Sequence, residues 1–265
     1  MSDYSQWDDY FWPHAPDVLR NKLGIRDPNI LSFVEAQITA VRMYQQVLEG
    51  PTGAFDFAHY CDVHRRTFGD IYEWAGRPRT VPNGPMTKRG PDVVNFDVND
   101  PAAPKVTYHY RPGPQVRDSA EYVFDRLKAE QYLSDLPPEE FVERLGRYWG
   151  TIDSVHPFRE GNTRTETIFF HQLCRNAGYD LGAEQLHARR AEFLAARFHG
   201  HAIGDRYRRL TALLHDTVQP RRSRELTARE TQWARRLYDT AERNADLIRR
   251  ATQTRQGRGE DGLEL

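Results

Sequence analysis

The sequence is poor in cysteine and contains no long apolar run. Its two cysteines, Cys61 and Cys174, are too few for a disulfide framework and too far apart for a CxxC metal pair, which fits a reducing compartment. No stretch approaches the roughly 18 apolar residues that cross a bilayer, and the first residues lack the basic and apolar regions of a signal peptide. We therefore expect a cytoplasmic protein without a membrane partner.

An excess of charge of one sign is also missing, because 37 lysines and arginines nearly balance 38 aspartates and glutamates. Such a chain has no overall field that attracts nucleic acid or an anionic membrane, so only a local patch could do so. We expect no direct nucleic-acid partner. The 265 residues suffice for one substantial core with a tail.

Apolar residues at helical spacing predict a mainly helical fold. Asp27 and Pro28 form a typical helix start, and Gly50 with Pro51 ends the helix that follows. Further helices are predicted over residues 57–71, 119–132, 138–155, 163–177 and 188–199, the last with an extension through Leu214.

Between residues 77 and 114 the chain is rich in proline, glycine, asparagine and aspartate, with strand-like pieces at 79–81 and 106–110. This composition predicts a long flap or hairpin, and loops of such length are more often functional than idle. A disordered surface insertion over residues 88–104 remains an alternative.

The charged C-terminal stretch carries Leu226, Trp233, Leu237 and Ile248 at the spacing of a narrow helical stripe. This pattern is compatible with a helix that docks on the core and equally with a solvated tail helix. The end, residues 256–265, is expected to fray.

One short run combines several groups suited to phosphate chemistry. His156 precedes Pro157, which ends the preceding helix, so its imidazole should project from a helix end into a turn. Histidine titrates near pH 6.5, which suits a general base that accepts a proton from a hydroxyl. Glu160 offers a hard oxygen ligand for Mg²⁺, and Arg164 can neutralise phosphate charge.

Gly161 and Asn162 lead into the next helix, whose free N–H groups form an anion site. Each group alone is weak evidence, because a lone histidine is usually structural and a Gly-Asn pair is usually only a turn. Their order and density indicate a phosphoryl- or nucleotidyl-transfer site.

The run from His156 to Arg164 resembles the signature of the Fic family, HPFx(D/E)GNGRxxR. Residues 68–80, FGDIYEWAGRPRT, are similar to the FGDIYPWAGKIRT stretch of that family. Residues 10–13 with 17–25 resemble the N-terminus of its toxin-like bacterial branch. The likeness spans about residues 10–215.

The resemblance implies an all-α Fic fold, a helical bundle with a β-hairpin flap that holds a target segment by strand addition. Within the flap, Arg79, Thr80 and Val81 would contact the target. The implied organisation has three parts: an N-terminal segment with the first core helix over 1–50, a Fic domain over 51–218 with its flap at about 77–114 and its signature loop at 156–164, and a charged C-terminal helix and tail over 219–265.

The implied activity is protein adenylylation, in which ATP donates AMP to a serine, threonine or tyrosine hydroxyl of a target protein. His156 would take the hydroxyl proton, and Glu160 would hold Mg²⁺ on the phosphates. Relatives of the toxin-like branch suggest a toxin with type II topoisomerase ATPase subunits as candidate targets and a small antitoxin as a possible partner.

The remaining signature residues would hold the loop and the nucleotide. Phe158 would anchor the loop in the core, while Gly161, Asn162 and Thr163 would cradle phosphate. Arg164 would balance the charge on the leaving pyrophosphate.

The sequence departs from the signature at two positions, where Thr163 replaces the second glycine and Thr167 the last arginine. A charge-assisted contact of that arginine with phosphate is worth about 1.5–3 kcal/mol, or about 10- to 150-fold in affinity. We therefore expect weaker or differently selective nucleotide use. Arg175 lies about two turns further along the helix, too far to be an obvious substitute. The cations that could reach in from the flap side are Arg77, Arg79, Lys88 and Arg89.

Several alternatives remain open at this stage. No segment matches the (S/T)xxxE(G/N) pattern of the family's inhibitory helix, so self-inhibition by that route is not expected. The protein could use another nucleotide donor, transfer phosphate, or be a catalytically impaired binding protein. A metal hydrolase is disfavoured, because the histidines lack spacing such as HExxH, and His199 and His201 are predicted to lie at the surface.

Overall fold

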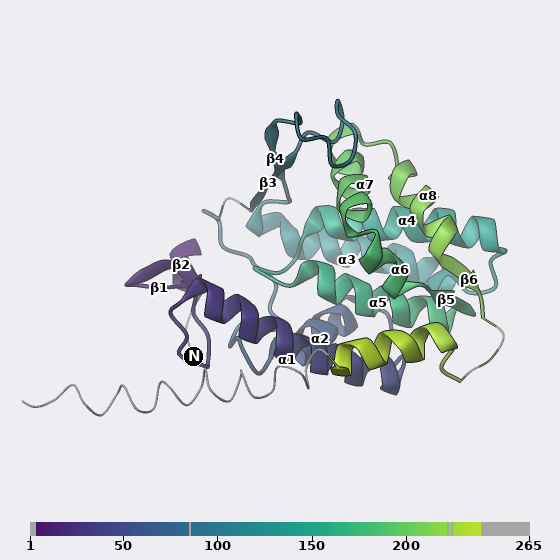
Figure 1. The fold of residues 1–265 in the computed structure, drawn as a ribbon, viewed down its shortest axis with the longest axis horizontal. Coiled ribbons are helices and arrows are strands. Elements are labelled where there is room, and N and C mark those ends of the chain that lie inside the picture. The colour runs from purple at the N-terminus through teal and green to yellow at the C-terminus, as the bar shows by residue number, and fades with distance from the viewer. Residues whose placement is uncertain (1–3, 85, 222, 224, 240–265) are drawn as a thin grey trace, which may run out of the picture.

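A computed structural model describes residues 4–84, 86–221, 223 and 225–239. These residues form a helical bundle with small antiparallel sheets, as Figure 1 shows, so the predicted all-α fold with a β-hairpin is confirmed. The helices are α1 (Pro28–Glu49), α2 (Phe57–Phe68), α3 (Gly113–Ala129), α4 (Pro138–Val155), α5 (Asn162–Asn176), α6 (Ala183–Ala188), α7 (Arg190–Ile203), α8 (Arg208–Thr217) and the 3-10 helices η1 (Trp7–Tyr10) and η2 (Gln131–Leu133). The paired strands are β1 (Phe11–Trp12) with β2 (Ala15–Leu19), β3 (Thr87–Pro91) with β4 (Lys105–His109), and β5 (Tyr179–Leu181) with β6 (Val218–Pro220).

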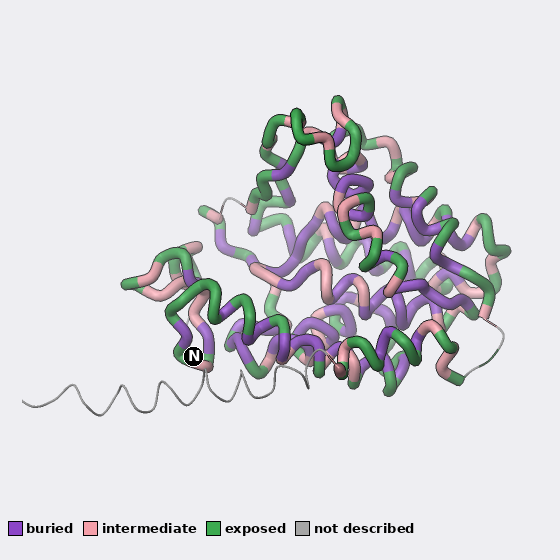
Figure 2. Tube along the Cα trace, in the orientation of Figure 1, coloured by how far each residue is buried: buried purple, intermediate pink, exposed green. Residues whose placement is uncertain are grey.

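Helices α4 and α5 form the centre of the bundle. The predicted bounds of α4 are confirmed, with Pro138 at its first position, where a missing N–H costs no hydrogen bond. α5 packs against α1, α2 and α4, and most of its residues are buried (Figure 2). Trp149 of α4 stacks on Phe170 of α5 with ring centroids 4.5 Å apart. Burial of each large apolar side chain here stabilises the fold by about 1.5–3 kcal/mol.

Several predicted helix boundaries are wrong, including the end of α3, which is Ala129 instead of residue 132. α2 ends at Phe68 instead of residue 71, because the chain turns there and the Ile71 N–H donates to the Phe68 carbonyl. α3 begins six residues earlier than residue 119, at Gly113, since Pro114 is tolerated in a first turn. The predicted helix through residue 214 is two helices, α7 and α8, because Gly204 adopts a left-handed φ of 68° that ends α7.

The flap is a hairpin whose strands are β3 and β4. Their register pairs Thr87 with His109 and Pro91 with Lys105, and the hairpin lies beside α7 (Figure 1). Residues 88–104 therefore belong to this hairpin, which argues against the alternative of a disordered insertion.

The predicted strand at 79–81 is wrong. The Arg79 guanidinium is buried and donates to the carbonyls of Val155, His156 and Arg111 instead of lying in a ladder. Val81 is buried as well. This segment ties the flap base to the end of α4, so two of the three residues expected to contact a target are covered.

The docking-helix interpretation of the C-terminal stretch is confirmed for residues 228–239, which are helical. Trp233 is buried against Met43 and Val47 of α1, and Leu226 and Leu237 are partly buried beside them. Ile248 and residues 240–265 lie outside the described part of the chain. Among the described helices, none is both long and apolar enough to cross a membrane.

Candidate active site at the signature loop

The backbone of the loop from His156 to Gly161 is shaped by two left-handed residues. His156 ends α4 with a φ of 50°, and Gly161 begins α5 with a φ of 83°. A side chain at Gly161 would place its Cβ 2.2 Å from the Phe68 ring, so only glycine fits. The loop thus turns sharply between the two central helices and presents the first N–H groups of α5.

Asn162 closes this loop through its side chain. Its Oδ1 accepts a hydrogen bond from the Phe158 N–H, and its Nδ2 donates to the Phe158 carbonyl, both at 2.8 Å. Phe158 itself is fully buried and stacks on Tyr60 and His64, as expected for an anchor. The Asn162 amide is therefore occupied, which leaves its backbone N–H as the group that can meet an anion.

His64 of α2 fastens the loop to the segment that follows α2. Its Nδ1 accepts the Gly76 N–H at 2.7 Å, so its Nε2 carries the proton and donates to the Glu160 carbonyl at 3.0 Å. Complete burial lowers the pKa of His64 to about 3. This histidine is therefore neutral and held in place. It links residues 68–76 to the signature loop through its two hydrogen bonds.

His156 lies buried at the end of α4 with its ring stacked on Tyr110 at 3.9 Å. Its Nδ1 is 3.8 Å from Oδ1 of Asp153, three residues earlier on the same helix. Burial lowers the pKa of His156, and Asp153 opposes that shift. A neutral imidazole near neutral pH can accept a proton, as a general base must.

Arg197 of α7 joins three groups beneath the loop. Its guanidinium donates to Oδ1 of Asp153 at 2.9 Å and, at 3.2 Å, to both Oε2 of Glu166 and Oγ1 of Thr163. Burial on its own would raise the pKa of Asp153, but Arg197 and the neighbouring histidine rings hold that pKa well below its usual range. Burial and the Asp153 charge raise the pKa of Glu166 well above its usual range. Arg197 thus binds two buried acids whose pKa values are shifted in opposite directions.

The ligand atoms of Asp153, His156 and Glu166 lie within 4.8 Å of one another, which resembles a metal site. However, Arg197 already binds both acids and supplies the positive charge that a cation would bring. His201 joins this cluster, with Nε2 3.1 Å from Oδ2 of Asp153 and a side chain only 5% exposed. Its predicted surface position is therefore wrong, because α7 packs this face onto α4.

The side chains of Glu160 and Arg164 lie at the start of α5, where Arg164 contacts α1. Arg164 donates to Glu35 and Thr39 of α1 and lies 3.5 Å from Oε1 of Glu160. The Glu160 side chain is 46% exposed, and its Oε1 accepts the Gly161 N–H at 2.9 Å. A half-exposed carboxylate at the start of α5 fits a Mg²⁺ ligand, because Mg²⁺ prefers carboxylate oxygens next to phosphates.

Residues of the signature loop line a cavity of about 220 Å³. Its lining residues are Trp7, Met86, Thr87, Lys88, Tyr110, His156, Arg159, Glu160, Gly161, Asn162, Thr163 and Arg164. Every predicted residue of the signature loop except the anchor Phe158 lines it, whereas Arg79, Thr80 and Val81 do not.

Thr167, which replaces the last arginine of the signature, donates its hydroxyl to the Thr163 carbonyl at 2.8 Å. Of the four flap-side cations that could compensate, Lys88 lines the cavity, while Arg77 lines a different groove and Arg79 is bound to carbonyls. Arg175 donates to the Val47 carbonyl of α1.

Sequence reasoning missed Tyr110, Asp153, Glu166, Arg197 and Glu35. Asp153 had a usable signal, because a residue three positions before His156 on a helix lies on the same face. Glu166 lies in α5 itself, but the sequence does not show that it meets Asp153 and Arg197. Tyr110, Arg197 and Glu35 come from distant elements, and no local pattern marks their approach to the loop.

Comparisons with known proteins agree on one family. The Fic/DOC family profile matches residues 54–174. The protein adenylyltransferase VbhT of Bartonella schoenbuchensis is 35% identical over 181 residues, which is 68% of this chain and 34% of that protein, so the chain spans about a third of its length. The probable protein adenylyltransferase y4lH of Sinorhizobium fredii is 30% identical over 191 residues, 72% of this chain and 88% of that protein.

A solved structure shows the same fold. The BepC protein of Bartonella tribocorum, crystallised with bound AMPPNP, superposes with a TM-score of 0.66 at 21% identity, over 83% of this chain and all (100%) of that one. Together with the sequence relatives, this likeness and the signature loop lead to one conclusion: the chain belongs to the Fic/DOC family.

Proposed function

We propose that this protein is an adenylyltransferase that transfers AMP from ATP to a serine, threonine or tyrosine hydroxyl of another protein. The observation that carries the proposal is that His156 lines the same cavity as Glu160, Arg164 and the start of α5. A base and an anion site that face one cavity are what attack of a hydroxyl on phosphorus requires.

In this reaction the hydroxyl oxygen of the target attacks the α-phosphorus of ATP. The bond between that phosphorus and the oxygen leading to the β-phosphate breaks, and pyrophosphate leaves. His156 accepts the hydroxyl proton. Because Nδ1 of His156 faces Asp153, Nε2 is the nitrogen available to the hydroxyl.

The phosphates are held by charge and by the helix N-terminus. The N–H groups at the start of α5 and the Arg164 guanidinium favour an anion here. Mg²⁺, when bound, supplies further positive charge to the phosphates, and Glu160 would hold it. Lys88, which lines the cavity, supplies the positive charge that is missing because Thr167 replaces the last arginine of the signature.

The target segment would lie along the hairpin of β3 and β4, whose base residues Thr87 and Lys88 line the cavity. Type II topoisomerase ATPase subunits are the first targets to test, in keeping with a cytoplasmic toxin that a small antitoxin controls. Such an antitoxin would bind without its usual arginine partner, because Thr167 replaces the last arginine of the signature.

The decisive experiment incubates the full chain with labelled ATP, Mg²⁺ and a bacterial lysate, alongside His156→Ala. We expect labelled protein with the wild type and at least about 100-fold less with the variant, as loss of a general base predicts. The mass added to the target separates AMP from UMP or phosphate, and either of the latter would point to another donor. An equal biological effect of wild type and His156→Ala would favour a binding protein without catalysis.

A further inference from the structure

A second cavity, of about 490 Å³, opens beside the active site. Tyr110, whose ring covers His156, lines both this cavity and the one at the signature loop. The second cavity also receives the cationic side chains Arg111, Arg147 and Arg206 and the rings of His109 and His201. No carboxylate is among its lining residues in the described part of the chain, and we call it the basic cavity.

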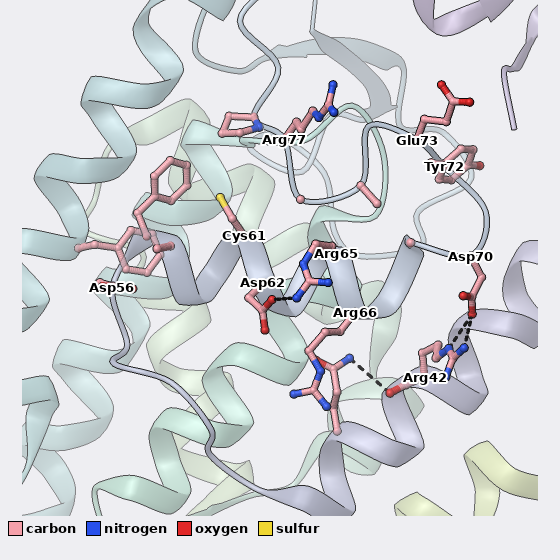
Figure 3. Close-up of a pocket in the computed structure, with 18 of the residues that line it drawn as sticks. Arg42, Asp56, Cys61, Asp62, Arg65, Arg66, Asp70, Tyr72, Glu73 and Arg77 are labelled. Atoms are coloured by element: carbon pink, nitrogen blue, oxygen red, sulfur yellow. Dashed lines mark hydrogen bonds and ion pairs between the residues drawn. The ribbon is translucent and has the colours of Figure 1, made fainter. Parts of the chain in front are cut away.

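The arginines of the basic cavity are not neutralised by neighbours. Arg111, Arg147 and Arg206 form no ion pair with any carboxylate of the described residues. A cavity of about 1160 Å³ between α1, α2 and α3 differs in this respect. There, Figure 3 shows arginines paired with acids of the same wall, such as Arg42 with Asp70.

Unpaired charges of one sign in a concave surface concentrate the electrostatic field and attract an oppositely charged ligand. Arginine guanidinium groups suit carboxylates in particular, because their planar fork donates two parallel hydrogen bonds to the two oxygens. His201 adds a buried ring whose Nδ1 has no hydrogen-bond partner among the described residues. These features indicate an anionic ligand rather than an apolar one.

The basic cavity adjoins the place where the target would lie. Thr87, which lines the cavity at the signature loop, is paired across the hairpin with His109, which lines the basic cavity. A segment that follows the hairpin with its hydroxyl at His156 would therefore extend past His109. Successive residues of an extended segment advance by about 3.3 Å, so positions a few residues from the hydroxyl would face the arginines.

We infer that the basic cavity binds acidic side chains of the target protein close to the hydroxyl that is modified. The inference rests on the proposed function for the identity of the ligand. It assigns specificity for an acidic sequence context to Arg111 and Arg147, which lie outside the signature loop.

The test measures binding of two fluorescein-labelled peptides, hexaglutamate and hexaglutamine, to the full chain by anisotropy at low salt. We expect the acidic peptide to bind at least about tenfold more tightly, and Arg111→Glu with Arg147→Glu to abolish that preference. Arg235→Glu, an exposed arginine outside both cavities, is the matched control and should keep the preference. The milder pair Arg111→Gln with Arg147→Gln, checked by thermal unfolding, guards against loss of the fold.

Three results would overturn the inference: equal binding of the two peptides, an unchanged preference in the charge-reversed variant, or an equal loss in Arg235→Glu. Micromolar binding of inorganic phosphate that depends on Arg147 would instead identify a site for free anions. Peptide binding needs no catalysis, so loss of AMP transfer with an intact acidic preference would contradict the proposed function alone. AMP transfer that ignores acidic residues near the hydroxyl would contradict this inference alone.

Discussion

The hydroxyl of Thr163 accepts a hydrogen bond at 3.2 Å from Arg197, which lies 34 residues further along the chain. Thr163 occupies the position at which the Fic signature has its second glycine. The threonine at this position therefore has a structural role: it connects the first turn of α5 to α7 through Arg197, which also binds Asp153.

Thr163→Gly should lower the free energy of unfolding by about 1–2 kcal/mol. The change removes one hydrogen bond of about 1 kcal/mol and places glycine within a helix, which costs roughly a further 0.5 kcal/mol relative to threonine. Urea unfolding measures the loss. Thr163→Ser keeps the hydroxyl and should cost much less; an equal loss in both variants would show that the bond to Arg197 contributes nothing.

Asp153→Asn should reduce kcat/KM for AMP transfer by about 10- to 100-fold, since the imidazole loses the negative charge that lies 3.8 Å from its Nδ1. The charge of Asp153 raises the pKa of His156, so its removal should shift the acidic limb of the pH–rate profile to lower pH. Asp125→Asn, at an exposed position of α3, is the control. An unaltered pH profile together with reduced activity would point to a purely structural role for Asp153.

Lys88→Ala should weaken ATP binding by about 10-fold or more, because Lys88 is the flap-side cation that lines the cavity at the signature loop. Lys88 also lowers the pKa of His156, so its loss should move the acidic limb to higher pH, opposite to Asp153→Asn. Its neighbour Arg89 does not line the cavity, and Arg89→Ala should leave binding unchanged. Equal weakening by both variants would argue for a general effect of flap charge.

Thr167→Arg restores the signature arginine and should strengthen ATP binding by about 10- to 150-fold. Calorimetric titration with a non-hydrolysable ATP analogue measures the change. Thr167→Gln, of similar length without charge, should give little gain. Unimproved binding in Thr167→Arg would mean that the triphosphate lies elsewhere in the cavity.

Glu230→Gln should destabilise the fold by about 2–4 kcal/mol at pH 7, because it leaves buried cations without their carboxylate. The Glu230 side chain is fully buried and bound by His171, Arg175 and Arg221. Burial alone would raise the pKa of Glu230, yet His171 and Arg221 hold that pKa below its usual value of 4.5. Its stabilising contribution is thus present above pH 4.5 and lost as the pH falls, so the gap to wild type should shrink in acid. A gap independent of pH would contradict this account.

Most of the helical fold could be predicted from the sequence, because apolar residues recur at helical spacing and prolines and glycines mark the ends. α4 is the best case, with its predicted bounds of 138 and 155 confirmed. The conformation of residues 79–81 could not be predicted, because in the sequence Arg79 looks like an exposed cation. The tertiary structure shows that its guanidinium donates to the carbonyls of Arg111, Val155 and His156.

The candidate site divides in the same way. The loop could be predicted from the sequence, because His156, Glu160, Gly161, Asn162 and Arg164 lie within nine residues of one another. Tertiary structure alone decided the surroundings of that loop: the Arg197 network beneath it, Lys88 at its rim and the basic cavity beside it. The physical reason is that charges act through space, and residues from separate helices meet only when the bundle closes around them.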